Sequence, residues 1–112
     1  MINQLRTYEI FAENRQAFLD RFRDHAARLM ADHGFRIQAM WEMERDGRLF
    51  FVYLLAWTDA AEMDARWAAF MANQEWKDIK ARTAAEHGNL VGEIESAVLT
   101  PTEFSAAIGS AT

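Results

Sequence analysis

Two apolar segments joined at Asp46-Gly47 constrain the fold of this chain most strongly. This dipeptide is typical of a two-residue β-hairpin turn, because both turn positions require positive φ. Such a turn fixes the register of strands expected at residues 35–44 and 48–57. The predicted cross-strand pairs are Arg45 with Arg48, Met43 with Phe50, and Trp41 with Val52.

Alternation along this hairpin divides its side chains between two faces. We expect the first face to be the core wall, made of Ile37, Ala39, Trp41, Met43, Phe50, Val52, Leu54 and Ala56. The second face carries an apolar strip along residues 49–57 that is too large to leave in water. Because one short chain can cover only one face, we expect a second copy to cover this strip. The predicted dimer interface is Phe51, Tyr53, Leu55 and Trp57.

Composition narrows the class of protein further. The 112 residues suit one domain. With 12 basic and 17 acidic residues the net charge is −5, which argues against nucleic acid or an anionic membrane as the main partner. The absence of cysteine excludes disulfides, thiolate catalysis and cysteine-ligated metals. No apolar run is long enough to span a bilayer, and the N-terminus does not resemble a signal peptide, so we expect a cytoplasmic protein.

Periodicity and capping residues predict the order β-α-β-β-α-β. Right-handed crossover rules turn this order into a ferredoxin-like α+β sandwich, with a four-stranded antiparallel sheet and its helices on one face. We expect one domain over 1–105 and a flexible tail over 106–112. Strands are predicted at 3–10, 35–44, 48–57 and 92–100, and helices at 15–33 and from 60 to 86 with an interruption at 73. The predicted capping residues are Asn14, Asp59 and Asn73 at helix starts, and Gly34 and Gly88 at helix ends.

The three histidines offer little catalytic signal. His33 and His87 each precede a glycine, as is typical of histidines at helix C-termini. His25 lies at the edge of the apolar stripe of the first helix and is the best candidate for a general base, with a partly buried structural histidine as the alternative. No spacing suggests a metal site, and no cofactor is predicted.

Four further residues are candidates for a ligand pocket. Trp41 and Trp67 fall on inward-facing stripes and could line an aromatic pocket between helices and sheet, although core packing is the alternative. Arg6 and Tyr8 share one face of the first strand, where an arginine beside a tyrosine suggests an anchor for an anion or a carbonyl. The sequence leaves open whether that face meets the helices or a second subunit.

Five segments of the chain resemble the NIPSNAP family. They are Leu5-Arg6-Thr7-Tyr8, His33-Gly34-Phe35, Trp41, Asn73-Gln74-Glu75-Trp76, and the ending from Ser96 to Ser105. The resemblance runs from about residue 3 to 105, and it implies the dimeric α/β-barrel fold and a homodimer. The chain departs from the family pattern at Tyr53, where a histidine is common, and at Thr100, where an arginine is frequent.

The resemblance leaves function open, because family members are of unclear role and fold does not confer function. The leading hypothesis is a small dimeric protein of unassigned role that binds a small molecule, with a small aromatic ligand as one option. The alternative is a cofactor-independent monooxygenase acting on an aromatic or quinol-like substrate, with His25 as its base. Haem binding, with His25 as axial ligand, is the third hypothesis. A cavity reached by His25 and Trp41 would favour the enzyme.

Overall fold

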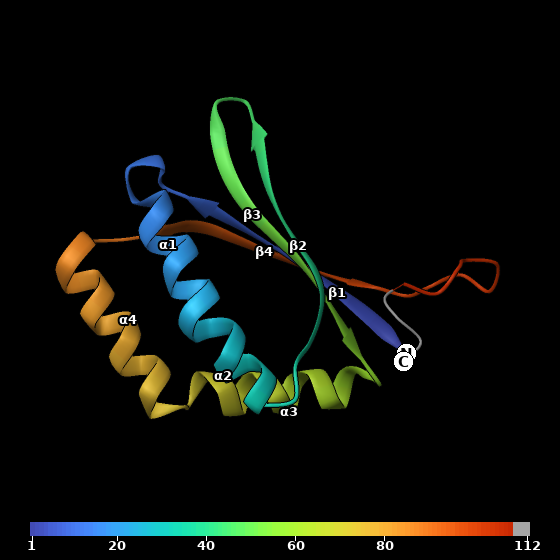
Figure 1. The fold of residues 1–112 in the computed structure, drawn as a ribbon. Coiled ribbons are helices and arrows are strands. Elements are labelled where there is room, and N and C mark those ends of the chain that lie inside the picture. The colour runs from blue at the N-terminus through green and yellow to red at the C-terminus, as the bar shows by residue number, and fades with distance from the viewer. Residues whose placement is uncertain (109–112) are drawn as a thin grey trace.

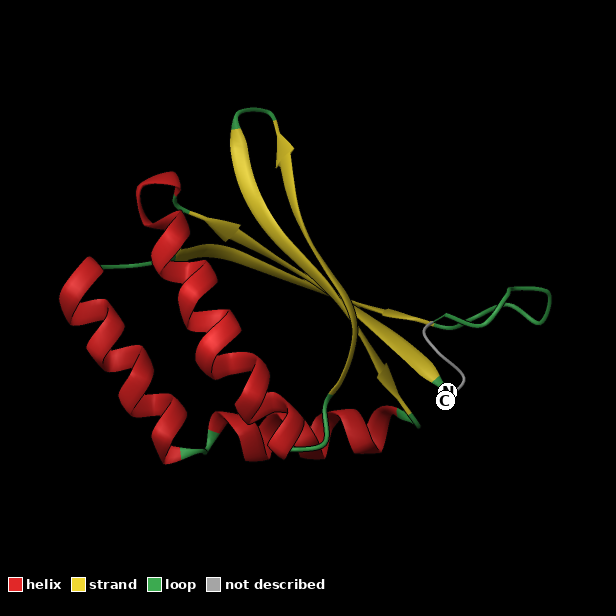
Figure 2. Cartoon of the chain, in the orientation of Figure 1, coloured by secondary structure: helices red, strands yellow, loops and turns green. Residues whose placement is uncertain are grey.

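The computed structural model describes residues 1–108 as one four-stranded sheet with its helices on one face (Figures 1 and 2). All strand pairs are antiparallel, in the order β2-β3-β1-β4. This is the predicted ferredoxin-like α+β arrangement. The strands are β1 Ile2–Ile10, β2 Arg36–Arg45, β3 Arg48–Trp57 and β4 Val91–Leu99. The helical elements are η1 Ala12–Asn14, α1 Arg15–Arg21, η2 Phe22–Ala26, α2 Ala27–Asp32, α3 Ala60–Met71 and α4 Gln74–His87.

The hairpin turn is formed as predicted. Asp46 and Gly47 have φ values of 53° and 75°, which are the positive angles that a type I′ turn requires. The predicted register is confirmed at all three expected pairs, which join Arg45 to Arg48, Met43 to Phe50, and Trp41 to Val52.

A β-bulge changes which residues of β2 share a face. Ile37 lies opposite Leu55 and Ala39 lies opposite Leu54, so one extra residue of β2 is inserted between them. A bulge of this kind reverses the alternation on one side of it. Ile37 therefore belongs to the helix-covered face, where it packs against the core, and not to the face of Trp41.

The structure reverses the predicted roles of the two faces. The strip on β3 packs under the helices of its own chain, and Tyr53, Leu55 and Trp57 each have 0% exposure. Phe51 is also buried, because Phe18 and Phe22 of the first helical segment pack against its ring at 5.1 and 4.6 Å between centroids. The prediction that Phe51, Tyr53, Leu55 and Trp57 form a dimer interface is therefore wrong. On β3 the covered face holds three aromatic side chains, Phe51, Tyr53 and Trp57, whereas the other face holds Phe50 alone, and burial of the larger apolar area is more favourable.

The helix-free face carries the residues that were predicted to form the core wall, apart from Ile37. Register places Trp41, Val52 and Thr7 in one row across it, and Ala39, Leu54 and Leu5 in the next. Trp41 is 50% exposed there. This face lies opposite the helices in Figure 2.

Two of the three predicted N-caps make the expected bond. Asp59 accepts a hydrogen bond from the backbone N–H of Glu62 at 2.8 Å, and Asn73 accepts one from Trp76 at 2.9 Å. Asn14 occupies the cap position without a capping bond, and instead its Nδ2 donates to the backbone carbonyls of His87 and Asn89. It thereby ties the start of α1 to the end of α4.

The first predicted helix is continuous in outline but contains a π-helical turn, η2, between α1 and α2. Residues 100–108 contain neither helix nor strand, and the rest of the predicted tail, 109–112, lies outside the described residues. No helix within residues 1–108 has the length and apolar character needed to cross a membrane.

Candidate functional site

A cavity of about 210 Å³ lies between the helices and the β1–β4 side of the sheet. Its walls come from β1, β4 and every α-helix, so most of the fold contributes to it. The apolar lining residues are Phe18, Phe22, Ala26, Met30, Trp67, Phe70, Met71, Trp76, Val91 and Ile94, and the polar ones are Arg6, Tyr8, Arg21 and Lys80. We call this space the central cavity. Its lining is mostly apolar and aromatic, with a few convergent polar groups, as is typical of small-molecule sites.

Arg6 and Tyr8 project from β1 on the helix-covered face, which answers the question that the sequence left open. Arg6 Nη2 donates to the Tyr8 hydroxyl at 3.2 Å, and the Tyr8 and Tyr53 hydroxyl oxygens lie 2.6 Å apart. Burial, together with the neighbouring Tyr8, raises the pKa of Tyr53 well above its usual value of 10.0. Tyr53 therefore stays protonated at neutral pH and remains a hydrogen-bonding hydroxyl beneath Tyr8.

A buried glutamine holds Trp67 in place beside Arg6. Gln4 Oε1 accepts hydrogen bonds from the indole N–H groups of Trp67 at 2.8 Å and of Trp57 at 3.0 Å, and Gln4 Nε2 donates to Ser96. The Trp67 ring then lies under the Arg6 guanidinium, whose carbon is 4.4 Å from the ring centroid. This cation–π contact gives both side chains a fixed orientation at the cavity wall.

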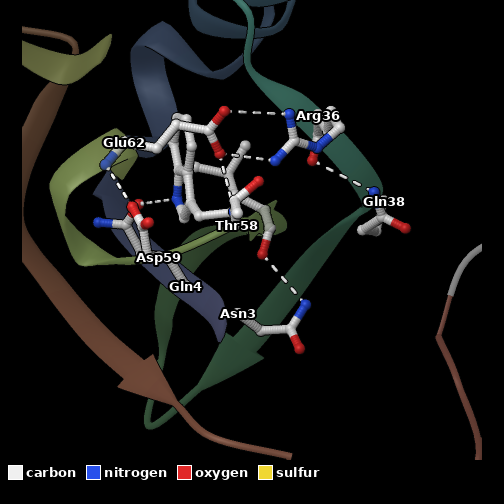
Figure 3. Close-up of polar contacts among 9 residues, drawn as sticks. Asn3, Gln4, Arg36, Gln38, Thr58, Asp59 and Glu62 are labelled. Atoms are coloured by element: carbon white, nitrogen blue, oxygen red, sulfur yellow. Dashed lines mark hydrogen bonds and ion pairs between the residues drawn. The ribbon is translucent and has the colours of Figure 1, made fainter. Parts of the chain in front are cut away.

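The start of α3 is fastened to the sheet by Glu62, as Figure 3 shows. Its carboxylate accepts from Arg36 Nη2 at 2.7 Å and from the backbone N–H of Thr58 at 2.8 Å. These bonds, led by that from Arg36, lower the pKa of Glu62 to about 2. Together with the Asp59 cap they fix the direction in which α3 leaves β3, and so the position of Trp67 two turns later.

Two further cations that line the cavity lie over Trp76. The Arg21 guanidinium carbon is 5.4 Å and the Lys80 ammonium nitrogen 5.7 Å from its ring centroid. Burial lowers the pKa of Arg21, and burial and the charge of Arg21 lower the pKa of Lys80. Trp76 is itself oriented by the Asn73 cap at the start of α4. The cavity is therefore lined by three cationic groups, Arg6, Arg21 and Lys80.

The π-helical turn shapes the remaining wall. Phe22 and Ala26 bound this turn, and both line the central cavity. A π-turn inserts a residue into the helix and alters the direction of the side chains around it, and such turns are frequent at functional sites. The spacing of apolar residues in this segment does not reveal the π-turn, because a helix with one π-turn keeps almost the same stripe of buried residues.

Three of the four residues predicted for a ligand pocket, Arg6, Tyr8 and Trp67, lie together at the central cavity. The prediction for Trp41 is wrong, since it lies half-exposed on the helix-free face. The predicted cavity exists, but neither Trp41 nor His25 reaches it. This removes the geometry that was expected to make His25 a base or an axial ligand there.

His25 instead lines a more polar groove of about 180 Å³ between the first helical segment and α4. Its Nδ1 is buried without a hydrogen-bond partner among the described residues. Acidic neighbours in the groove include Asp20, Asp24 and Glu86. Within residues 1–108 no three histidine or acidic side chains are grouped closely enough to hold a metal ion.

Sequence reasoning missed Arg21, Trp76 and Lys80 as cavity residues. A signal was present, because Trp76 and Lys80 are four residues apart and so share one face of α4. Arg21 similarly follows the buried Phe18 by three residues, so the two share one face of α1. Placing the three together required the relative positions of α1 and α4, which helical periodicity does not provide.

The NIPSNAP family model matches residues 3–106, nearly all of the chain. The chain belongs to the NIPSNAP family. This confirms the resemblance found in the sequence.

Solved NIPSNAP structures share the fold at low identity. A NIPSNAP-like domain protein from Burkholderia xenovorans, described as uncharacterized, is 18% identical with a TM-score of 0.80, over 96% of this chain and 90% of that one. A NIPSNAP family protein of unknown function from Agrobacterium tumefaciens is 20% identical with a TM-score of 0.79, over 94% and 91%.

The same fold extends to a second group of solved structures. A putative antibiotic biosynthesis monooxygenase from Nitrosomonas europaea is 14% identical with a TM-score of 0.59, over 90% of this chain and 98% of that one. At this identity the similarity shows the fold alone. No protein of curated function matches the chain in sequence.

Proposed function

We propose that this NIPSNAP protein is a homodimer whose subunits each bind a small, mainly apolar molecule in the central cavity. The observation that carries the proposal is the convergence of Arg6, Tyr8 and Trp67 on one aromatic-walled space of about 210 Å³. These side chains come from β1 and α3 and are held by bonds to buried groups. A preorganised polar set in an apolar cleft is the common form of a ligand site.

The size of the cavity limits the ligand. An apolar cavity of about 150 Å³ accepts benzene, so the central cavity suits a substituted single-ring compound. The walls support an aromatic ligand, because Phe22, Phe70 and Trp76 offer ring faces and edges to it. Haem is much larger than this space and is not supported as a ligand.

Dimerisation is supported by the helix-free face of the sheet. Trp41 and Leu99 are 50% and 43% exposed on this face, and Leu5 and Val52 beside them are partly exposed. A contiguous apolar surface of this kind favours burial against a partner. A second copy meeting it through a two-fold axis covers both surfaces at once, since each subunit brings the same patch.

The second candidate is a cofactor-independent oxygenase acting on an aromatic or quinol-like substrate at the same cavity. The fold shared with putative monooxygenases supports it, as does the position of Lys80. Burial lowers the pKa of Lys80, so its ammonium group releases a proton more readily than that of an exposed lysine. Lys80 thus replaces His25 as the candidate for removing a phenolic proton. Oxygen uptake with hydroquinones that is lost in Lys80→Gln would support this candidate.

Thermal-shift measurements with single-ring aromatic compounds test the binding proposal, because a ligand of the native state raises the apparent melting temperature. Ala26→Leu places a larger side chain inside the cavity and should remove the shift, while Ala85→Leu on the exposed face of α4 should retain it. Should Ala26→Leu fail to fold, Met71→Trp narrows the cavity from a half-exposed position. Equal shifts in the cavity and control variants would contradict the proposal.

A further inference from the structure

We infer that the ligand of the central cavity is an organic anion, a single-ring aromatic carboxylate or a close equivalent, whose charged group lies among Arg6, Arg21 and Lys80. This inference rests on the proposed function and specifies the class of compound. It is carried by the distribution of charges in the protein and by the donors that line the cavity.

The three cavity cations are partly buried and yet have no acidic partner among residues 1–108. The other cations without a salt bridge there, Arg45, Arg66, Lys77 and Arg82, are exposed to solvent. Most other arginines of the helical layer and sheet pair with a carboxylate. Those pairs are Arg15 with Glu42, Arg23 with Asp24, Arg28 with Glu75, Arg36 with Glu62, and Arg48 with Glu9. No carboxylate of residues 1–108 forms a salt bridge with Arg6, Arg21 or Lys80, and no acidic residue lines the cavity. In a chain of net charge −5 this leaves a cationic cavity inside an acidic protein.

Arg6 presents a hydrogen-bond donor without an acceptor. Its Nη2 donates to Tyr8, but its Nε is buried and has no partner among the described residues. Buried polar groups are nearly always paired, so an orphaned guanidinium N–H at a cavity wall indicates an acceptor supplied by a ligand. A carboxylate fits this donor well, since guanidinium–carboxylate bonds are charge-assisted.

Arg21 and Lys80 are like charges held near one aromatic ring. Both lie over Trp76, and the charge of Arg21 disfavours that of Lys80. Both cations contact the face of the Trp76 ring. This attraction offsets only part of the repulsion between the two charges and of the cost of removing them from water. An anion between them would interact favourably with both charges.

The apolar walls of the cavity indicate the chemistry of the uncharged end of the ligand. Phe18, Phe22, Phe70 and Trp76 line the cavity and leave an apolar space for a ring. Aromatic side chains stack on a ligand ring through offset or edge-to-face geometry. The central cavity of about 210 Å³ is larger than the cavity of about 150 Å³ that accepts benzene by the volume of only a few atoms. One aromatic ring with a small charged substituent therefore fills it.

Three isosteric probes test the charge preference: benzoate, benzamide and benzylamine, titrated into the ¹⁵N-labelled protein and followed by NMR. Benzoate is expected to bind at least about tenfold more tightly than benzamide, because hydrogen bonds to charged groups are stronger than neutral ones. Benzylamine is expected not to bind. Arg21→Gln and Lys80→Gln should each weaken benzoate several-fold and leave benzamide unchanged. Arg82→Gln, at an exposed position of α4 that does not line the central cavity, is the matched control and should change neither.

The outcomes separate this inference from the proposed function. If benzamide binds as tightly as benzoate, and both cavity variants bind benzoate as the wild type does, the inference is overturned while binding in the cavity stands. If none of these probes binds, nor any neutral single-ring compound in the thermal-shift measurements, both proposals fail. Benzoate binding that persists in Ala26→Leu would place the anion elsewhere and would also overturn the inference.

Discussion

The hydroxyl groups of Tyr8 and Tyr53 lie 2.6 Å apart and join the wall of the central cavity to the buried core of the sheet. Tyr8 faces the cavity and also accepts a hydrogen bond from Arg6. Tyr53 is completely buried behind it. The position of Tyr8 in the cavity wall thus depends on its buried hydrogen bond to Tyr53. That bond requires the Tyr53 hydroxyl.

Replacing Tyr53 by Phe removes that hydroxyl with little change in shape. We expect the free energy of unfolding at neutral pH to fall by about 1 kcal/mol, the usual loss for a neutral hydrogen bond. Equilibrium denaturation with urea measures it, with an unchanged slope as the sign that the fold is retained. A variant as stable as the wild type would show that the contact contributes nothing.

Tyr53 also predicts an alkaline limit of stability. Its pKa is raised in the folded state, mainly by burial, so between pH 10 and the folded-state value the native protein binds more protons than the unfolded chain. Stability from this group is therefore complete below about pH 10 and is lost as pH rises above it. We expect the pH dependence of unfolding above pH 10 to be shallower in Tyr53→Phe. Identical alkaline profiles would contradict the assignment.

The lowered pKa of Glu62 predicts that the fold loses stability at low pH. Because the bond from Arg36 lowers its pKa from 4.5 to about 2, its contribution is present above pH 4.5 and is lost as pH falls toward 2. Glu62→Gln should be less stable than the wild type at neutral pH and lose less on acidification through this window. Asp64→Asn, at an exposed position of the same helix, should behave as the wild type does. Thermal unfolding followed by circular dichroism at each pH measures the difference.

Gln4 predicts a larger effect on stability. Gln4→Leu leaves the indole N–H groups of Trp57 and Trp67 without their shared acceptor. An unpaired buried donor costs about 1 to 3 kcal/mol, so for the two indole donors we expect a loss of about 2 to 6 kcal/mol in urea denaturation. Gln16→Leu, an exposed glutamine on α1, should change stability little. A loss in Gln4→Leu no larger than in this control would contradict the role given to Gln4.

If the helix-free face forms the proposed dimer interface, a charge introduced there should prevent dimerisation. Val52→Glu and Trp41→Glu place a carboxylate in the middle of the proposed interface and should convert the dimer to a monomer, since a buried unpaired charge is costly. Ala69→Glu on the exposed side of α3 should leave the dimer intact. Analytical ultracentrifugation at micromolar concentration distinguishes the two. A wild-type monomer under these conditions would contradict the dimer proposal.

The hairpin shows how far the sequence could be interpreted. Asp46-Gly47 fixed the register correctly, because turn chemistry and side-chain alternation are local. The choice of face was wrong, because both sides of β3 are apolar and only packing against Phe18 and Phe22 decides between them. The bulge after Ile37 carries no composition signal. Arg6 and Tyr8 were recognised as a pair from strand alternation, whereas Arg21 and Lys80 meet only through tertiary packing.

The indole N–H signals of the four tryptophans offer the most direct test of the central cavity. Trp67 and Trp76 line it, and Trp41 lies on the other face of the sheet. During titration of the labelled protein with benzoate, we predict saturable shifts of the Trp67 and Trp76 signals with no matching shift of Trp41. Shifts confined to Trp41, or no saturable shift of Trp67 and Trp76 with any single-ring compound, would contradict a ligand site between the helices and the sheet.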